Sequence, residues 1–217
     1  MSRTRQKLHT GSAGGRRPVS EALPSGRYSI WVASDARERI LVALRDLLSR
    51  GGTGAVTLEA VATAAGVSKG GLLYHFPSKS ALYLGLLAAV RDRVVADMAQ
   101  ATLTLGAARA YLQYAIPADE AEGGFFTSLI AAVRTGPDTD EHAAELLADI
   151  FRAWEAPMRA AVADPVQAEM LRLVGNGVYL STIAGLPPTP PAVLAEIFDR
   201  LLAGTPVTSG LRHQVSG

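Results

Sequence analysis

The feature that most restricts the fold is the segment TLEAVATAAGVSKGGLLYHFPSK at residues 57–79. Thr57 is a suitable helix cap. Apolar side chains follow it with the spacing of one helix face, at Leu58, Val61, Ala62 and Ala65. Gly66 ends this helix, Ser68 caps a second one, and Pro77 closes that one because a residue before proline disfavours helical geometry. The pattern predicts two short helices joined by a tight turn.

Apolar spacing elsewhere also favours helices. One is expected to open at Ser34-Asp35 and to stop at Gly51-Gly52, and another is expected from Ser78 to about residue 100. The remaining helices are expected at 104–115, 119–135, 139–162, 166–184 and 190–203. Because no run alternates apolar and polar residues, no sheet is expected. The predicted fold is all-α, with an N-terminal three-helix helix-turn-helix unit, a helical bundle behind it, and about nine helices in all.

Four regions are expected along the chain. Residues 1–33 form a basic tail that lacks apolar periodicity, so we expect disorder there. The helix-turn-helix domain is expected at 34–82 with its motif at 57–76, followed by a helical regulatory and dimerisation domain at 83–204. Residues 205–217 are expected to be a flexible tail.

Charge is distributed unevenly along the chain. Residues 1–90 hold 12 Lys and Arg against 5 Asp and Glu, a balance of +7, whereas the rest of the chain carries −6 because the total is +1. A basic front half suggests contact with a polyanion, and a chance distribution of surface charge is the alternative.

Composition limits the class of protein. Hydrophobic residues make up 48% of the 217 residues, which indicates a globular chain. Because there is no cysteine, disulfides and thiolate zinc sites are excluded, which fits a reducing cytoplasm. No apolar run approaches the length of a membrane helix or of a signal peptide's core, so we expect a soluble, cytoplasmic protein that is not exported.

The two short helices suggest a role in DNA binding. In a helix-turn-helix unit the second helix lies in the major groove. Ser68 can donate to a phosphate or a base, Lys69 adds positive charge, and the absence of side chains at Gly70 and Gly71 allows close backbone approach. Tyr74, His75 and Lys79 are expected to contact the DNA backbone. The alternatives are a solvated Lys69 and a core Tyr74; Phe76 is expected in the core.

The segment TLEAVATAAGVSKGGLLYHFPSKSAL resembles the DNA-binding region of the TetR family of bacterial transcriptional regulators, from about residue 36 to residue 84. The resemblance implies DNA-contacting or supporting roles for Thr57, His75 and Lys79. It also implies that a second set of residues faces bases: Ser68, Lys69, Gly70, Gly71 and Leu72. Leu73 stands where the family usually has tyrosine, one place before Tyr74, and Gly71 replaces a frequent Thr, Ser or Ala. These departures leave the operator sequence open.

For the back half, the resemblance implies a bundle that pairs two subunits and often holds a small effector. The segment LRLVGNGVYLSTIAGLPPTPPAVLAEIFDRLLAG is similar to the last two helices of many members, and these helices with 139–162 are the expected dimer surface. A homodimer would suit palindromic double-stranded operator DNA. The candidate ligand-binding residues are Tyr111, Tyr114, Phe125, Phe126, Arg134, Trp154 and Met158. Their mostly apolar character suggests a small hydrophobic effector, and ordinary core packing is the alternative. Asn176 either bonds across a helix pair or faces water.

The function predicted from these observations is a sequence-specific DNA-binding regulator, a dimeric repressor released by a small hydrophobic effector. The first alternative is an effector-independent DNA-binding protein controlled by a protein partner. An enzyme is the remote alternative, because the four histidines lie far apart and no nucleophile motif is present. The glycine-rich segments 51–54 and 175–177 do not follow a strand, so no nucleotide loop, cofactor or metal is expected.

Overall fold

The computed structural model describes residues 35–135 and 141–204, and the two tails predicted at 1–33 and 205–217 lie outside that part. The described part contains nine α-helices, one short 3-10 helix and no strand, which confirms the all-α prediction. The elements are α1 Ala36–Gly51, η1 Thr53–Ala55, α2 Leu58–Ala65, α3 Lys69–His75, α4 Lys79–Leu105, α5 Ala107–Tyr114, α6 Glu120–Thr135, α7 Glu141–Ala161, α8 Pro165–Ile183 and α9 Pro191–Ala203. None of the helices in the described ranges combines the length and hydropathy needed to cross a membrane.

The first helix forms as its sequence predicts. The side chain of Asp35 accepts a hydrogen bond of 2.8 Å from the Glu38 N–H and so caps α1. Gly52 ends the helix with a φ of 62°, a conformation that favours glycine. The apolar stripe of α1 lies in the core: Ile40, Leu41, Ala43, Leu44 and Leu48 are all buried. This helix therefore anchors the N-terminal unit on the rest of the molecule.

The fourth helix is longer than the sequence pattern indicated. We expected α4 to end at about residue 100, but it continues to Leu105, and α5 begins at Ala107 rather than at 104. No proline or glycine interrupts 86–105, and Gly106, with a φ of 79°, supplies the break. The helix crosses the expected boundary between 34–82 and 83–204, and that division stays a prediction.

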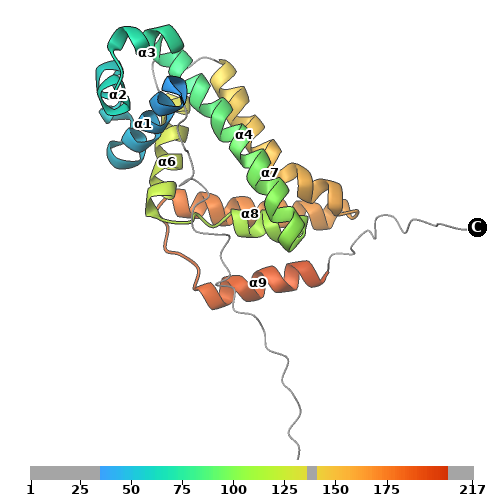
Figure 1. Ribbon diagram of the computed structural model, residues 1–217. Coiled ribbons are helices and arrows are strands. Elements are labelled where there is room, and N and C mark those ends of the chain that lie inside the picture. Colours follow the sequence, from blue (N-terminus) through green and yellow to red (C-terminus); the bar gives the residue numbers. More distant parts are fainter. Residues whose placement is uncertain (1–34, 136–140, 205–217) are drawn as a thin grey trace, which may run out of the picture.

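Figure 1 shows α1, α2 and α3 gathered at one end of the molecule, with α8 and α9 at the other. The long helices α4 and α7 run side by side between these ends, and α6 packs against α1. One continuous apolar core joins the helices, from Ile40 in α1 to Phe198 in α9. Both α4 and α6 contact α1, so a movement of either helix would displace the helix-turn-helix unit.

Candidate functional site

Side-chain caps set the geometry of α2 and α3. The Thr57 hydroxyl accepts a hydrogen bond of 3.0 Å from the Ala60 N–H, and the Ser68 hydroxyl accepts one of 3.0 Å from the Gly71 N–H. Between the helices Gly66 takes the left-handed conformation, with a φ of 65°. These local interactions turn the chain sharply and present one side of α3 to solvent.

Buried side chains seat α3 on the core. Leu72 is fully buried and Phe76 is nearly so, which confirms the prediction of a core Phe76. A Cβ on Gly85 of α4 would lie 2.4 Å from the Cε1 of Phe76, so only glycine lets this ring approach α4 so closely. Sequence reasoning missed Gly85, although an isolated glycine within an apolar helical pattern is the signal of such an approach. The opposite side of α3 is thereby left facing outward.

The structure leaves most of the predicted DNA-binding residues exposed or half-buried, on α3 and at the N-terminal ends of α2 and α4. Tyr74 is 85% exposed, so it is not a core aromatic residue. The other exposed members are Thr57, Ser68, Lys69 and Gly70, while Gly71, His75 and Lys79 are half-buried. Leu72 is the exception: its side chain is 0% exposed, so the expectation that it faces bases is wrong. Its position in the α3 register turns it into the core, where an apolar side chain gains most from burial. We call the other eight residues the α3 surface.

A surface ion pair holds Lys69 in the absence of DNA. Its ammonium group binds the carboxylate of Glu59 on α2, and both side chains are exposed. The hydrogen bond from Lys69, with a backbone hydrogen bond and the positive charge adding to it, lowers the pKa of Glu59. Exposed ion pairs contribute little to stability because water screens them. Lys69 can therefore leave Glu59 for a phosphate at small cost.

A second feature is a small apolar cavity in the helical bundle. Its volume is about 20 Å³, room for about one water molecule. The lining residues come from α4 to α8: Val94, Tyr114, Glu122, Phe126, Ile130, Leu147, Ile150, Phe151, Trp154 and Tyr179. Three predicted ligand residues are among them, namely Tyr114, Phe126 and Trp154.

The other four predicted ligand residues do not line the cavity. Tyr111, Phe125 and Met158 are buried in the core outside it, and Arg134 is exposed. Core packing, the alternative for these aromatic and apolar residues, explains the first three. Sequence reasoning missed Glu122, Phe151 and Tyr179, because the residues that face one cavity from several helices share no local pattern.

Half of the residues that line the cavity are aromatic. The Trp154 ring centroid lies 5.6 Å from that of Tyr179 and 6.1 Å from that of Phe151. Phe126 meets Tyr179 edge to face, with ring centroids 5.6 Å apart. Behind the wall, Tyr111 stacks on Trp154 with centroids 4.6 Å apart. The aromatic part of the cavity lining is thus a cluster of rings in mutual contact.

Glu122 is the one residue with a formal charge among the described residues that line the cavity. Its carboxylate accepts a hydrogen bond of 2.6 Å from the Ala118 N–H. Its own N–H donates to the Asp119 carboxylate at 2.8 Å, which caps the first turn of α6. Burial, and then the charge of Glu122, raise the pKa of Tyr179. These two side chains therefore share one poorly solvated environment.

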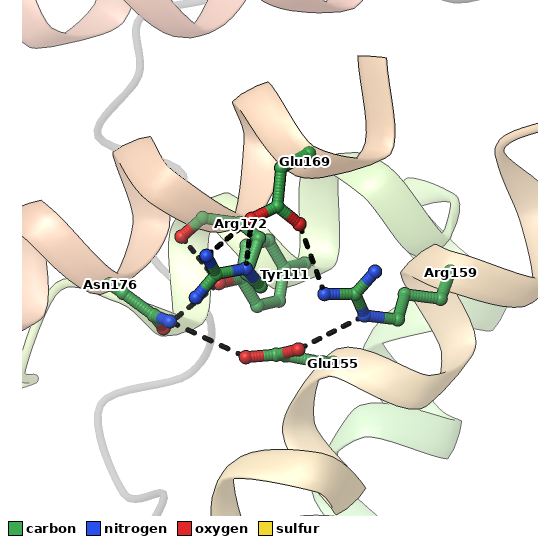
Figure 2. Close-up of polar contacts among 6 residues, drawn as sticks. All are labelled: Tyr111, Glu155, Arg159, Glu169, Arg172 and Asn176. Atoms are coloured by element: carbon green, nitrogen blue, oxygen red, sulfur yellow. Dashed lines mark hydrogen bonds and ion pairs between the residues drawn. The ribbon is translucent and has the colours of Figure 1, made fainter. Parts of the chain in front are cut away.

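A polar network joins α5, α7 and α8 beside the cavity (Figure 2). The Tyr111 hydroxyl lies 3.1 Å from Oδ1 of Asn176 and 3.2 Å from the backbone oxygen of Arg172. Asn176 in turn donates to Glu155 at 3.4 Å, which favours the prediction that it bonds across a helix pair. Burial raises the pKa of Tyr111, so its hydroxyl stays protonated and donates.

The network continues through two arginines toward the surface. Arg159 bonds Glu155 at 3.1 Å and Glu169 at 3.3 Å, and Glu169 also binds Arg172 (Figure 2). The Tyr111 ring also packs tightly on the backbone of α8, because a Cβ on Gly175 would lie 2.5 Å from Cε1 of Tyr111. The tyrosine that stacks on the cavity wall is therefore fixed to α8.

Helix α6 connects the cavity with α1. Glu122, Phe126 and Ile130 face the cavity. Elsewhere on the helix, a Cβ on Gly124 would lie 3.2 Å from the backbone oxygen of Ser49 in α1. One helix thus touches both the cavity and the helix that carries the DNA-binding unit.

An exposed apolar stripe runs along α8 and onto α9. On α8 it follows one helix face, with Val166, Met170, Leu173 and Leu180. On α9, Val193 and Ile197 are also exposed, four residues apart. In the described part of α7 no large apolar side chain is exposed. We call the six residues on α8 and α9 the α8–α9 stripe.

Comparison with known proteins places these features in one class, that of helix-turn-helix regulators. Residues 40–86 match the family described as bacterial regulatory proteins, tetR family, and residues 106–206 match the tetracyclin repressor-like C-terminal domain. The chain therefore belongs to the TetR family, whose members are transcriptional regulators rather than enzymes.

Individual relatives agree with this membership. The chain is 46% identical over 59 residues to the HTH-type transcriptional regulator RutR of Escherichia coli K12, a match that covers 27% of this chain and 28% of the length of RutR. The structure of SCO7518 from Streptomyces coelicolor A3(2), described as a transcriptional regulator, has a TM-score of 0.62 and 23% identity, over 76% of this chain and 97% of that one. The multidrug binding protein EbrR, solved with malachite green, has a TM-score of 0.53 and 25% identity, over 79% and 98%.

Proposed function

We propose that the protein is a dimeric, sequence-specific DNA-binding repressor, released from its operator by a small effector. The observation that carries the proposal is the α3 surface, on which Lys69 and Tyr74 face outward while Leu72 seats the helix on the core. Exposed Lys, Tyr, Ser and backbone groups are those that commonly contact DNA phosphates. A repressor of this kind acts on chromosomal DNA, so we assign it to the cytoplasm.

The proposed dimer forms through the α8–α9 stripe. A row of apolar side chains exposed on two neighbouring helices suits a second copy, because a two-fold axis pairs the same patch on both subunits. The two α3 helices of such a dimer, held about 34–36 Å apart, would suit a palindromic operator. The expected participation of α7 finds no support in its surface residues.

The dimer can be tested with matched charge insertions. Leu173→Asp places a charge within the stripe, whereas Val95→Asp does so at an exposed apolar residue of α4 outside it. We expect analytical ultracentrifugation to find Leu173→Asp monomeric and Val95→Asp dimeric. Dimerisation of both variants would assign the interface to another surface.

The proposed effector site is the ring-lined cavity. A ligand large enough to regulate does not fit in about 20 Å³, so its entry must move the walls apart. Since α6 is one wall and also packs on α1, widening of the cavity would shift the DNA-binding unit. The effector must prefer the widened state for this coupling to work. The complex of EbrR with malachite green supports a small-molecule site in this fold.

The small cavity also favours a second candidate function, an effector-independent regulator controlled by a protein partner. The two functions differ in a simple measurement, because a ligand that binds the folded state raises its melting temperature. A library of small aromatic compounds, scanned by thermal melting, should contain stabilising members under the first proposal and none under the second.

Selection of bound duplexes from random sequence tests DNA binding and identifies the operator. On the selected duplex, Lys69→Ala should weaken binding and reduce the slope of log affinity against log salt by about 1, as loss of one phosphate contact predicts. Arg152→Ala removes an exposed charge of α7, outside the α3 surface, and should change neither quantity. Selection of no duplex at low salt would overturn the proposal.

A further inference from the structure

We propose that the ligand of the cavity is a lipophilic cation, with the Glu122 carboxylate as its counter-charge. This inference rests on the proposed effector site and names the chemical class that the site would take. It is carried by the juxtaposition of one buried carboxylate with a wall of aromatic rings.

The charge of the lining selects the sign of the ligand. Glu122 is 8% exposed and lines the cavity, and no Lys or Arg stands among the described residues that line it. An anionic ligand would meet this carboxylate in a poorly solvated space and be repelled. A cation there would gain a charge-assisted contact that water screens weakly.

The rings favour the same class of ligand. Tyr114, Phe126, Phe151, Trp154 and Tyr179 surround the space. The faces of such rings attract cations, and their area binds the apolar body of the ligand. A small hydrophilic cation would lose its hydration without filling the site, so the charge must be carried on an aromatic or otherwise apolar frame.

The carboxylate is fixed in place before a ligand arrives. The Ala118 N–H holds one oxygen at 2.6 Å, and the first turn of α6 is capped by Asp119. A fixed charge loses little conformational entropy on binding. The same geometry allows a clean test, because the amide oxygen of a glutamine can also accept from the Ala118 N–H.

The probes are malachite green, which is a lipophilic cation, and its leuco form, which is neutral and of similar size. Both are titrated by calorimetry into the full chain at slightly acidic pH. We expect the wild type to bind the cation at least about tenfold more tightly than the leuco form. Glu122→Gln should weaken cation binding about 30-fold and leave leuco binding within about twofold, as loss of one buried charge partner predicts.

Two further variants complete the test. Glu120→Gln makes the same charge change at an exposed position in the same helix turn, and it should bind both probes as the wild type does. Ile130→Trp fills the cavity and should abolish binding of both, which would locate the probes there.

Three outcomes would overturn the inference. Equal binding of both probes by the wild type, or equal weakening of both by Glu122→Gln, would leave the effector cavity standing and remove the cation preference. Unchanged cation binding by Glu122→Gln would do the same. Binding of neither probe by the wild type would overturn this inference, while the thermal-melting library would still decide whether the cavity takes another effector, and the duplex selection would decide DNA binding separately.

Discussion

The α3 surface and the cavity are built in opposite ways. At the α3 surface the decisive hydrogen bonds join residues three apart in the sequence, Thr57 with Ala60 and Ser68 with Gly71. Around the cavity they join distant residues: the Trp154 N–H donates to the Tyr111 backbone oxygen across 43 positions, and Tyr111 reaches Asn176 across 65. The first region is therefore specified locally, and the second exists only once the bundle has packed.

The largest effect should follow from removing the contact that seats α3. Leu72→Ala should lower the free energy of unfolding by about 2–5 kcal/mol, because it deletes a fully buried side chain and leaves a cavity. Chemical denaturation measures this loss. Leu73→Ala is the matched control, since Leu73 is only half-buried on the same helix and should cost less. Equal losses in the two variants would mean that Leu72 does not seat α3.

A smaller effect is expected where α8 meets Tyr111. Gly175→Ala puts a methyl group 2.5 Å from a ring atom of Tyr111, so it should destabilise the fold by about 1–3 kcal/mol despite the better helix propensity of alanine. Gly177→Ala in the same helix meets nothing within 4 Å and should be neutral or stabilising by up to about 1 kcal/mol. Thermal unfolding at a fixed protein concentration compares them. Similar shifts in both variants would contradict the tight approach of Tyr111 to α8.

The difference between the two regions explains what the sequence could predict. Caps, glycine stops and apolar spacing gave the helices within a few residues, apart from the end of α4, and they placed Ser68, Lys69 and Tyr74 together. Leu72 was misassigned because a family pattern states which helix faces DNA, whereas the register of the helix decides which side chain points inward. The cavity residues come from five helices whose packing no local pattern encodes, so Trp154 was nominated and its neighbour Tyr179 was missed.

Loss of a cap should separate the two regions functionally. Ser68→Ala removes the acceptor for the Gly71 N–H and should destabilise the fold by about 1 kcal/mol. Gly70 and Gly71 already weaken α3, so loss of the cap should also loosen this helix. Duplex affinity should therefore fall, by about tenfold in a gel shift. Asp164→Ala removes the cap of α8, which bonds the Val166 N–H at 3.0 Å. Asp164→Ala should destabilise the fold by about as much as Ser68→Ala does. It should leave duplex affinity unchanged if α3 alone contacts the bases of the duplex.

The smallest effect is expected at the ion pair between Glu59 and Lys69. Glu59→Gln removes a negative charge beside the α3 surface and frees Lys69, so duplex affinity should rise by about two- to fivefold at low salt, and less at high salt. Fluorescence anisotropy at two salt concentrations measures both values. A fall in affinity would mean that Glu59 positions Lys69 for DNA instead of competing with it.

The same pair gives a pH dependence whose sign is fixed. Because folding lowers the pKa of Glu59 from its ordinary value of 4.5, its contribution to stability is present above about pH 4.5 and is lost as the pH falls through the lowered value. Wild-type stability should therefore drop slightly more than that of Glu59→Gln between about pH 5 and pH 3. Parallel pH profiles would show that Lys69 is held too loosely to matter, and that the α3 surface carries its positive charge free in solution.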